Sequence, residues 1–167
     1  MSGRVTVSAA GPEDWMRSRA LRLRALREDP DAFARTHAAE AAQPDAFWKA
    51  RLVSATATLL ATLDGTDVGI SVLAPWRDSP GDVGLFGVWV AADARGKGVG
   101  DALMRQAIAE AQAAGVQRIR LEVGDFNQRA INLYARAGFV RSGRQSALPP
   151  PRQHITEQEW VYPLTQK

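Results

Sequence analysis

Apolar and polar residues alternate in several short stretches of the chain, which is the pattern of a half-buried β-strand. The first such stretch runs from Arg4 to Ser8. Three further β-rich runs follow at 55–63, 68–75 and 83–90. The first two of these are separated by Asp64-Gly65-Thr66-Asp67, a sequence typical of a hairpin turn. The first half of the chain therefore predicts an antiparallel meander.

Two segments that precede the meander show helical spacing instead. Between residues 15 and 28, apolar residues such as Ala20 recur every three to four positions, and arginines fill the other face. We expect an amphipathic helix that ends before Pro30, because the residue before a proline disfavours helical backbone. A shorter helix is expected over 44–53. The Ala-rich stretch 31–43 between them is expected to form a helical turn and a loop.

The second half of the chain alternates helices with strands. The expected elements are a helix over 99–114, a strand over 118–123, a helix over 128–137 and strands over 139–146 and 153–162. Gly115 and Gly138 follow the two helices, as glycine often does at a helix C-terminus. Asn127 precedes the second helix and is a good N-cap, since its side-chain oxygen can accept a hydrogen bond from a free backbone amide.

The order of these elements is β-α-α-β-β-β-α-β-α-β-β. The meander favours antiparallel neighbours, and the later alternation of strands with helices favours a parallel pair. We therefore expect an α/β fold with a mixed, mostly antiparallel central sheet of about seven strands and helices on both faces. Residues 1–167 are expected to form one domain, because the chain has no internal repeat and no linker long enough to divide it.

Composition excludes several kinds of chemistry. The chain has no cysteine, so disulfides, thiolate zinc sites and a cysteine nucleophile are excluded. It has only two histidines, His37 and His154, and they are far apart in sequence. A metal site built from histidines or a Ser-His-Asp triad is therefore disfavoured. We expect no metal centre. Hydrophobic residues make up 46% and charged residues 23% of the 167 residues, an ordinary globular mixture that argues against disorder.

Charge and hydropathy narrow the range of partners. The formal net charge of +3 is a mild excess that suits anionic ligands, and no helix-turn-helix or aromatic-basic stacking pattern indicates nucleic acid. No apolar run approaches the roughly 18 residues that span a bilayer, and the N-terminus leads into a strand pattern without a signal-peptide region. We expect a cytoplasmic protein with no membrane and no nucleic-acid partner. Exposed strand edges are compatible with a homodimer.

A glycine-rich loop between a strand and the long helix is the sharpest local feature. It reads Arg95-Gly96-Lys97-Gly98-Val99-Gly100. Its glycines let the backbone turn tightly, and the following helix adds partial positive charge, so the loop suits a phosphate. A Walker loop is excluded because Gly98 follows Lys97, and a dinucleotide fingerprint fits poorly because Asp101 stands at its third glycine position. The pattern R-x-x-G-x-G does fit; the alternative is a turn chosen for packing alone.

Further motifs flank this loop in the sequence. They are Val88-Trp89-Val90, Leu121-Glu122-Val123, Asn127, Ala130, Leu133-Tyr134 and Gly138-Phe139. Together with the loop, they resemble the GCN5-related N-acetyltransferases (GNAT), in that family's order and spacing, from about Leu85 to Phe139. The resemblance implies an acyl-CoA transferase fold and an enzyme that moves acetyl from acetyl-CoA directly to an amine. No covalent intermediate is required, which suits a chain without cysteine.

The resemblance also implies where acetyl-CoA binds. The amides of Gly96 to Asp101 would face the pyrophosphate, and the strand from Val88 to Val90 would pair its backbone with the pantetheine arm. Asn127 is expected to cap its helix and to touch the cofactor arm. The cofactor-binding residues expected on this basis are Val88, Trp89, Val90, Arg95, Gly96, Lys97, Gly98, Val99, Gly100, Asp101, Asn127, Ala130 and Tyr134.

Tyr134 is the candidate general acid. Ala130 lies one turn before it on the same helix face, and a small residue there leaves room for a ligand beside the phenol. A free phenol has a pKa of about 10 and a thiol about 8.5, so proton transfer to a departing thiolate is uphill by about 2 kcal/mol. That is tolerable for a group that mainly donates a hydrogen bond to developing charge. The resemblance places the family's usual acid at Tyr134; the alternative is a packing tyrosine.

Glu122 is the candidate base. On its strand it shares one face with Arg120, while Ile119, Leu121 and Val123 share the other. It could accept the amine proton, directly or through a water. The resemblance extends to bacterial enzymes that acetylate the N-terminus of a ribosomal protein, in which a glutamate five residues before the motif asparagine has this function. The alternatives are an ion pair with Arg120 or with a neighbouring strand, and ordered water as the base.

Substrate selection is expected to come from segments outside the cofactor motif, residues 13–53 and 142–154. A small amine metabolite or antibiotic is the first expectation for the acceptor, and a peptide N-terminus or a lysine is the second. The arginines between Arg17 and Arg27 form either a solvated face or the border of an acidic substrate site. The alternative function is a non-catalytic acyl-CoA-binding module of the same fold.

Overall fold

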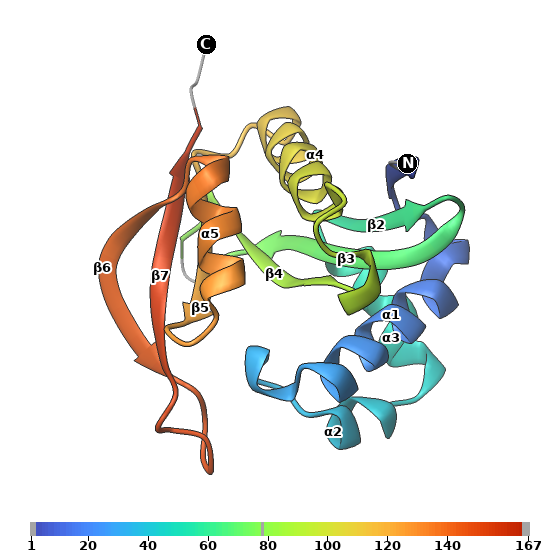
Figure 1. Cartoon of the computed structure of the whole chain (residues 1–167), viewed down its shortest axis with the longest axis horizontal. Helices are drawn as coiled ribbons and strands as arrows, with labels where there is room; N and C mark the ends of the chain where they lie inside the picture. Colours follow the sequence, from blue (N-terminus) through green and yellow to red (C-terminus); the bar gives the residue numbers. More distant parts are fainter. Residues whose placement is uncertain (1–2, 78, 165–167) are drawn as a thin grey trace.

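Seven strands form one mixed sheet within the residues that the computed structural model describes, 3–77 and 79–164 (Figure 1). Their order across the sheet is β1-β2-β3-β4-β5-β7-β6, and each neighbouring pair is antiparallel except the parallel pair β4 and β5. The strands are β1 (Val5–Ala9), β2 (Ala57–Leu63), β3 (Thr66–Pro75), β4 (Asp82–Val90), β5 (Arg118–Gly124), β6 (Val140–Ala147) and β7 (Thr156–Pro163). The predicted mixed, mostly antiparallel sheet is confirmed.

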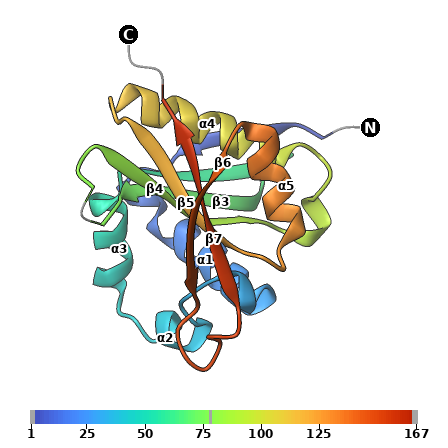
Figure 2. The same ribbon diagram turned by 90° about the vertical axis from the view of Figure 1, so that its left-hand side faces the viewer.

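Helices cover both faces of this sheet, as predicted. The helices are α1 (Trp15–Glu28), α2 (His37–Ala41), α3 (Asp45–Ser54), α4 (Val99–Ala113) and α5 (Gln128–Ala137), with short 3-10 turns η1 (Pro12–Asp14), η2 (Pro30–Ala32) and η3 (Ala92–Ala94). α4 packs across β1 to β4 with α5 beside it, and α1 packs against β3 and β4 from the opposite face (Figure 1, Figure 2). Among the described residues, no helix is long and apolar enough to cross a membrane.

The element boundaries follow the sequence pattern closely, with local differences. The stretch 31–43 forms part of η2 and the short helix α2, and the last strand begins at Thr156 rather than at residue 153. The hairpin between β2 and β3 turns on two residues, Asp64 and Gly65, rather than on four. Their φ angles are +51° and +83°, the conformation that a two-residue hairpin turn requires.

Helix α1 buries Leu23 and Leu26, as its apolar spacing predicted, but differs from the prediction at other positions. Ala20 is exposed, whereas Leu21 and Ala25 are buried together with Leu23 and Leu26. The reason is that α1 contacts the sheet on one side and α2 and α3 on the other, so a wider arc of its surface is covered. The single apolar stripe assumed from the sequence applies to a helix with one packing partner.

Strands β4 and β5 separate along their length, and this separation positions the site. They pair only where residues 82–84 meet residues 118–120. That closed end is held by the buried carboxylate of Asp82, which accepts hydrogen bonds from Arg118 Nε (3.1 Å) and Arg120 Nε (2.7 Å). Farther along, β4 carries an extra residue relative to β3 near Gly87, whose φ is +61°. Such a bulge bends a strand, and here it adds to the separation that begins after residue 84.

Candidate active site

Two cavities meet where β4 and β5 separate. The loop cavity, about 800 Å³, is bounded by residues 28–32, the end of β4, the loop 94–101 and α5. The wedge cavity, about 450 Å³, is bounded by α1, residues 32–35, α3, β2 to β4 and the adjoining ends of β5 and β7. Both walls include Ala32, Val88, Asn127, Ala130 and Tyr134. A ligand in one cavity therefore lies next to a ligand in the other.

The glycines of the loop have two different structural causes. Gly96 and Gly98 have φ angles of +75° and +86°, and a Cβ placed on either would meet nothing within 4 Å. Their backbone conformation, rather than close packing, requires glycine. A Cβ on Gly100 would instead lie 3.2 Å from Leu133 Cδ2, so this glycine allows α4 to approach α5. The packing interpretation therefore holds for Gly100 and not for the other two.

The backbone amides of the loop form an anion-binding arrangement. In the described part of the chain, no backbone acceptor receives a hydrogen bond from the amides of residues 96–101. Gly98 is the N-cap of α4, and the first amides of a helix have no partner within it. The partial positive charge at that end adds to the attraction of a negative group. Open space at Gly96 and Gly98 leaves room for a phosphate to approach.

Arg95 is turned inward rather than toward an anion on the loop. Its Nε donates a hydrogen bond to the Val90 carbonyl oxygen (2.9 Å), and its Nη2 donates to Asp29 Oδ2 (3.0 Å). The same carboxylate oxygen accepts a hydrogen bond from Nε1 of Trp89, whose ring is buried (2.7 Å). Arg95 therefore ties the loop to the end of α1, and its charge is paired. Lys97, the other cation of the motif, is exposed.

Cations from α5 line the loop cavity instead. Arg129 and Arg136 both belong to its wall. Arg136 Nη2 also binds Asp101 Oδ1 (3.1 Å), the acidic residue in the first turn of α4. Sequence reasoning missed both arginines. Their spacing of seven residues places them on one face of the helix within the motif segment, which could have indicated them. The loop cavity thus combines free backbone amides with exposed guanidinium groups, a combination suited to phosphates.

Tyr134 lies on α5 at the junction of the two cavities. Its side chain is almost fully buried, with 6% exposed, and its ring packs 6.0 Å from the ring of Phe139. Burial raises the pKa of the Tyr134 hydroxyl well above its ordinary value of 10. The phenol therefore stays protonated at neutral pH and can donate a hydrogen bond. Ala130, one turn earlier, also lines both cavities, and room for a ligand beside the phenol remains a prediction.

Asn127 caps α5, which confirms the prediction for its helix. Its Oδ1 accepts a hydrogen bond from the Ala130 amide (3.3 Å). Asn127 also belongs to the walls of both cavities. Contact with a cofactor remains a prediction. Gly138 ends the same helix with φ +107°, the left-handed conformation expected at a helix C-terminus.

Glu122 lies in the wall of the wedge cavity with an ion-pair partner that sequence reasoning did not identify. Its carboxylate binds the guanidinium of Arg77, from the segment between β3 and β4, and accepts a hydrogen bond from Ser146 Oγ (2.5 Å). The neighbour considered from the sequence, Arg120, binds Asp82 and Glu159 instead, at 2.7 and 2.9 Å. Glu122 faces the cavity because β5 and β4 have separated at this point.

Glu157, on β7, is a second carboxylate in the wedge cavity that sequence reasoning missed. It pairs in register with Gly124, so it lies on the same sheet face as Glu122. Burial first, and the charge of Glu122 second, raise the pKa of Glu157 above its ordinary value. Glu157 and the buried Glu159 are two positions apart, so the strand pattern places both carboxylates on one face. The sequence alone did not indicate which strand β7 adjoins.

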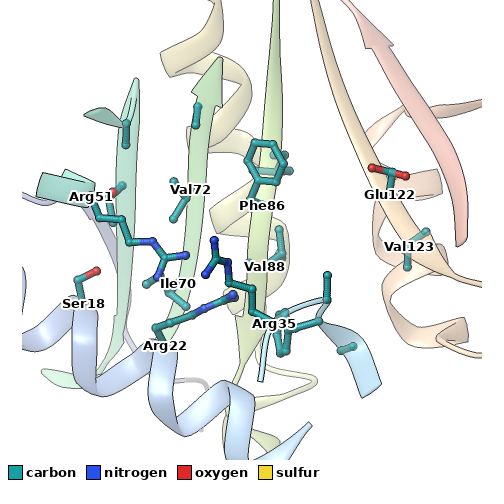
Figure 3. A pocket seen from close by; sticks show the side chains of 18 of the residues that line it. Ser18, Arg22, Arg35, Arg51, Ile70, Val72, Phe86, Val88, Glu122 and Val123 are labelled. Carbon is teal, nitrogen blue, oxygen red and sulfur yellow. The ribbon is translucent and has the colours of Figure 1, made fainter. Parts of the chain in front are cut away.

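Three arginines surround one carboxylate on the opposite side of the wedge cavity. Glu40 on α2 is fully buried and accepts hydrogen bonds from Arg22 Nε (2.9 Å) and Arg51 Nη1 (2.9 Å). Arg35 Nε lies 3.8 Å from its Oε2 atom. Burial alone would raise the pKa of Glu40, but the hydrogen bonds from Arg22 and Arg51 outweigh it and hold the pKa below its usual range. Figure 3 shows the three guanidinium groups turned toward one another.

The two segments expected to select substrate are placed differently. Residues 13–53 supply much of the wedge-cavity wall. Residues 142–154, all of which are described, line neither cavity. They act on the walls indirectly: Ser146 binds Glu122, and Arg152 donates hydrogen bonds to the carbonyl oxygens of Pro30 (2.6 Å) and Ala34 (2.9 Å).

Comparison with known sequences gives one family over most of the chain. The family model described as "Acetyltransferase (GNAT) family" matches residues 20–139. The chain is also similar to the streptothricin acetyltransferase of Streptomyces lavendulae, with 46% identity over 59 residues. That match covers 35% of this chain and 31% of the relative, so it concerns about a third of the relative's length.

Solved structures match nearly the whole fold. A Salmonella typhimurium protein assigned as an acetyltransferase, whose structure contains its cofactor acetyl-CoA, gives a TM-score of 0.77 at 20% identity and covers 98% of this chain and 96% of that one. A protein of Acinetobacter baylyi ADP1 with the same assignment gives a TM-score of 0.82 at 16% identity and covers 100% of this chain and 97% of that one. At such identities the likeness concerns the fold.

Proposed function

This chain belongs to the acetyltransferase (GNAT) family, and we propose that it transfers the acetyl group of acetyl-CoA directly to the primary amine of a small molecule. The observation that carries the proposal is the meeting of the loop cavity and the wedge cavity at Tyr134. Acetyl-CoA would occupy the loop cavity and the acceptor the wedge cavity. The amine and the thioester would then meet beside the Tyr134 hydroxyl.

The residues of the loop cavity fit acetyl-CoA, which supplies an activated thioester carbonyl. The free amides of residues 96–101 would donate hydrogen bonds to its pyrophosphate. Beyond residue 84, β4 no longer pairs with β5, so the backbone groups on that edge, including those of Val88, are available to the amides of the pantetheine arm. Arg129 and Arg136 would add charge for phosphate groups.

In the proposed transfer, the amine nitrogen attacks the thioester carbonyl carbon; a C–N bond forms and the C–S bond breaks. Tyr134 donates a hydrogen bond to the departing sulfur, which leaves as a thiolate and takes up a proton from solvent water afterwards. Because burial raises the pKa of Tyr134, full proton transfer to a thiolate, whose conjugate acid has a pKa of about 8.5, is strongly uphill. The main contribution of Tyr134 is therefore hydrogen bonding to the charge that develops on sulfur.

A carboxylate accepts the proton that the amine loses. Glu122 is the proposed base because it lines the wedge cavity, and Glu157 is a second acceptor on the same sheet face. The raised pKa of Glu157 makes its carboxylate a stronger base than that of an ordinary glutamate. The need for such a base depends on the acceptor, since an α-amine of pKa about 7.7–8.0 is already partly neutral at pH 7.4.

The shape of the wedge cavity supports a small acceptor over a peptide segment. Helices α1 and α3 and residues 32–35 form part of its wall, next to strands β2 to β4. Its volume of about 450 Å³ lies at the low end of the range for small-molecule sites. The relative from Streptomyces lavendulae is named for a small-molecule antibiotic, which is consistent with an acceptor of this class.

Thermal unfolding against increasing acetyl-CoA, with NAD and ATP as controls, tests the proposal first. Ligand at about 100 times its dissociation constant stabilises the folded state by roughly 2.7 kcal/mol. For a chain of this size the expected rise in Tm is about 5–11 °C. A saturable rise with acetyl-CoA alone supports the assignment and justifies a screen of amine acceptors. No rise at millimolar acetyl-CoA would contradict it.

A further inference from the structure

The arginine cluster of the wedge cavity carries more positive charge than its carboxylate neutralises. Arg22, Arg35 and Arg51 belong to the cavity wall, and Glu40 is the carboxylate they share. Among the described residues, no second acidic side chain forms an ion pair with these three arginines. Two positive charges therefore remain at this end of the cavity. Arg22 also lies over the ring of Phe33, and Arg51 over the rings of Phe47 and Trp48, contacts that hold the guanidinium groups in place without neutralising their charge.

Arg22 carries part of this charge to the wall that β4 forms. Its Nε and Nη2 atoms bind Glu40, while Nη1 points the other way and would lie 3.2 Å from a Cβ built on Gly87. Gly87 is the bulged residue of β4 and immediately precedes Val88, which lines both cavities. The Arg22 side chain is only 14% exposed, so its free N–H groups have little access to water outside the cavity.

The opposite side of the wedge cavity carries two carboxylates, one of which, Glu122, is paired with Arg77. Glu122 and Glu157 lie there, on β5 and β7. Figure 3 shows Glu122 across β4 from the three guanidinium groups. The cavity therefore has unneutralised cations on the side of α1 to α3 and carboxylates on the side of β5 and β7. An acceptor with an amine but no anionic group would contact only the carboxylate end.

We propose that the acceptor is a small amino acid or similar zwitterion, whose anionic group binds Arg22, Arg35 and Arg51 while its amine faces Glu122, Glu157 and Tyr134. This inference rests on the proposed function and names the substrate class of the same site. Bidentate guanidinium geometry matches a carboxylate or a phosphonate. Between the two charged ends, the cavity wall is apolar and suits an apolar side chain; it includes Phe33, Trp48, Ile70, Val72, Leu85 and Phe86.

Acceptor pairs that differ only in the anionic group test this directly. L-Alanine, L-leucine and L-phenylalanine are each compared with their C-terminal amides at saturating acetyl-CoA. Losing a charge-assisted contact costs about ten- to a hundredfold in kcat/KM, so we expect the carboxylate member to be preferred by that factor for at least one pair. The comparison is stringent, because the free carboxylate makes the α-amine more basic and intrinsic reactivity therefore favours the amide.

Matched variants locate the effect in the cluster. Arg35→Gln changes a side chain that is 60% exposed, and Arg27→Gln on α1 changes one that is 64% exposed and lines neither cavity. We expect Arg35→Gln to raise KM for the carboxylate acceptor about tenfold and to leave the acetyl-CoA Kd within twofold. Arg35→Lys should recover part of the loss, and Arg27→Gln should change neither constant. Equal effects of the Arg35→Gln and Arg27→Gln variants would overturn the assignment.

A binding measurement separates failure of this inference from failure of the proposed function. Thermal unfolding is followed with N-acetyl-L-phenylalanine and with its amide, each with and without CoA. Stabilisation by the carboxylate form alone supports the anion site whether or not turnover is detected. The inference would be overturned if the enzyme acetylates amines that lack an anionic group and shows no preference for the carboxylate form, either in turnover or in thermal stabilisation. The proposed function would then still stand. A peptide with an acidic second residue and an amidated C-terminus that outperforms the amino acids would overturn the small-molecule class.

Discussion

The loop cavity and the wedge cavity are built from different parts of the chain and from different chemical groups. The loop cavity takes its anion-binding groups from backbone amides of one short segment, residues 96–101, held by two left-handed glycines. The wedge cavity takes its charges from side chains on α1, α3, β5 and β7 and on the segment before α2. Backbone geometry is indifferent to most side-chain changes, whereas a side-chain site changes with each substitution. We infer that the first cavity suits a constant cosubstrate and the second a selected acceptor.

Tyr134 joins the two cavities, and its removal is expected to have the largest effect. Tyr134→Phe keeps the ring in its packing against Phe139 but removes the hydroxyl. We expect kcat to fall about 100-fold or more, because a hydrogen bond to developing charge is lost, while the acetyl-CoA Kd stays within twofold. Steady-state kinetics and calorimetric titration measure the two constants. Tyr162→Phe, outside both cavities, is the control; an unchanged kcat in the Tyr134 variant would exclude Tyr134 as the acid.

Gly98→Val is expected to disrupt the loop cavity and to leave the wedge cavity intact. A β-branched residue at φ +86° is strained and moves the amides at the start of α4, so we expect the acetyl-CoA Kd to rise about 30-fold and stability to fall by about 1–2 kcal/mol. Gly65→Val is a matched control, because Gly65 has φ +83° and the same open surroundings in the β2–β3 turn. It should lose similar stability in denaturant titration and keep its acetyl-CoA affinity. Equal loss of affinity in both variants would contradict the proposed role of the loop.

Acid should weaken the wedge cavity through Glu40. The pKa of Glu40 is lower in the folded state than the unfolded value of about 4.3, so its ion pairs stabilise the fold above that pH. This stability is lost as pH falls through about 4.3 toward the folded pKa. Glu40→Gln should lower the free energy of unfolding by about 1–2 kcal/mol at pH 7 and reduce its dependence on acid. Urea titrations at pH 7 and pH 4 test this, with the exposed Asp93→Asn as control; a pH dependence identical to the wild type would contradict it.

Replacing Glu157 is expected to have the smallest effect on the rate. It should mainly change how kcat/KM depends on pH. Its raised pKa means that it is protonated, and lost as a base, at a higher pH than an ordinary glutamate. We expect kcat/KM of the wild type to fall as pH drops through that raised pKa. Glu157→Gln should lower kcat/KM by less than about tenfold at pH 7 and move the acidic limb of the profile. An unmoved acidic limb in the Glu157 variant, with a moved one in Glu122→Gln, would assign the base to Glu122 alone.

The loop and its flanking motifs could be predicted because each depends on nearby residues. Asn127 caps a helix that starts at the next position, and Gly98 adopts a conformation that its own lack of a side chain permits. The strand boundaries and helix α1 were predicted from the spacing of apolar residues, which is visible within a short stretch of sequence. Where α1 differed, at Ala20 and Leu21, the reason was a second packing partner that no local pattern records.

Side-chain partners could not be predicted because they depend on distant segments. Arg95 binds Asp29 from 66 positions away, and Glu122 binds Arg77 from 45 positions away. Arg120, adjacent on the same strand face, was the partner that local reasoning offered for Glu122. A strand pattern determines which residues share a face, but the pairing of β5 with β7 and its separation from β4 decide what lies opposite them.

The sequence by itself determined the order of the elements, the mixed sheet and the glycine loop, because backbone preference and burial period act over a few residues. Tertiary structure alone decided that Arg95 ties down the loop, that Glu157 joins Glu122, and that three arginines share Glu40. Those arrangements follow from how helices and strands pack across the sheet. The charge that an acceptor meets is a property of that packing, since no single segment of the chain contains it.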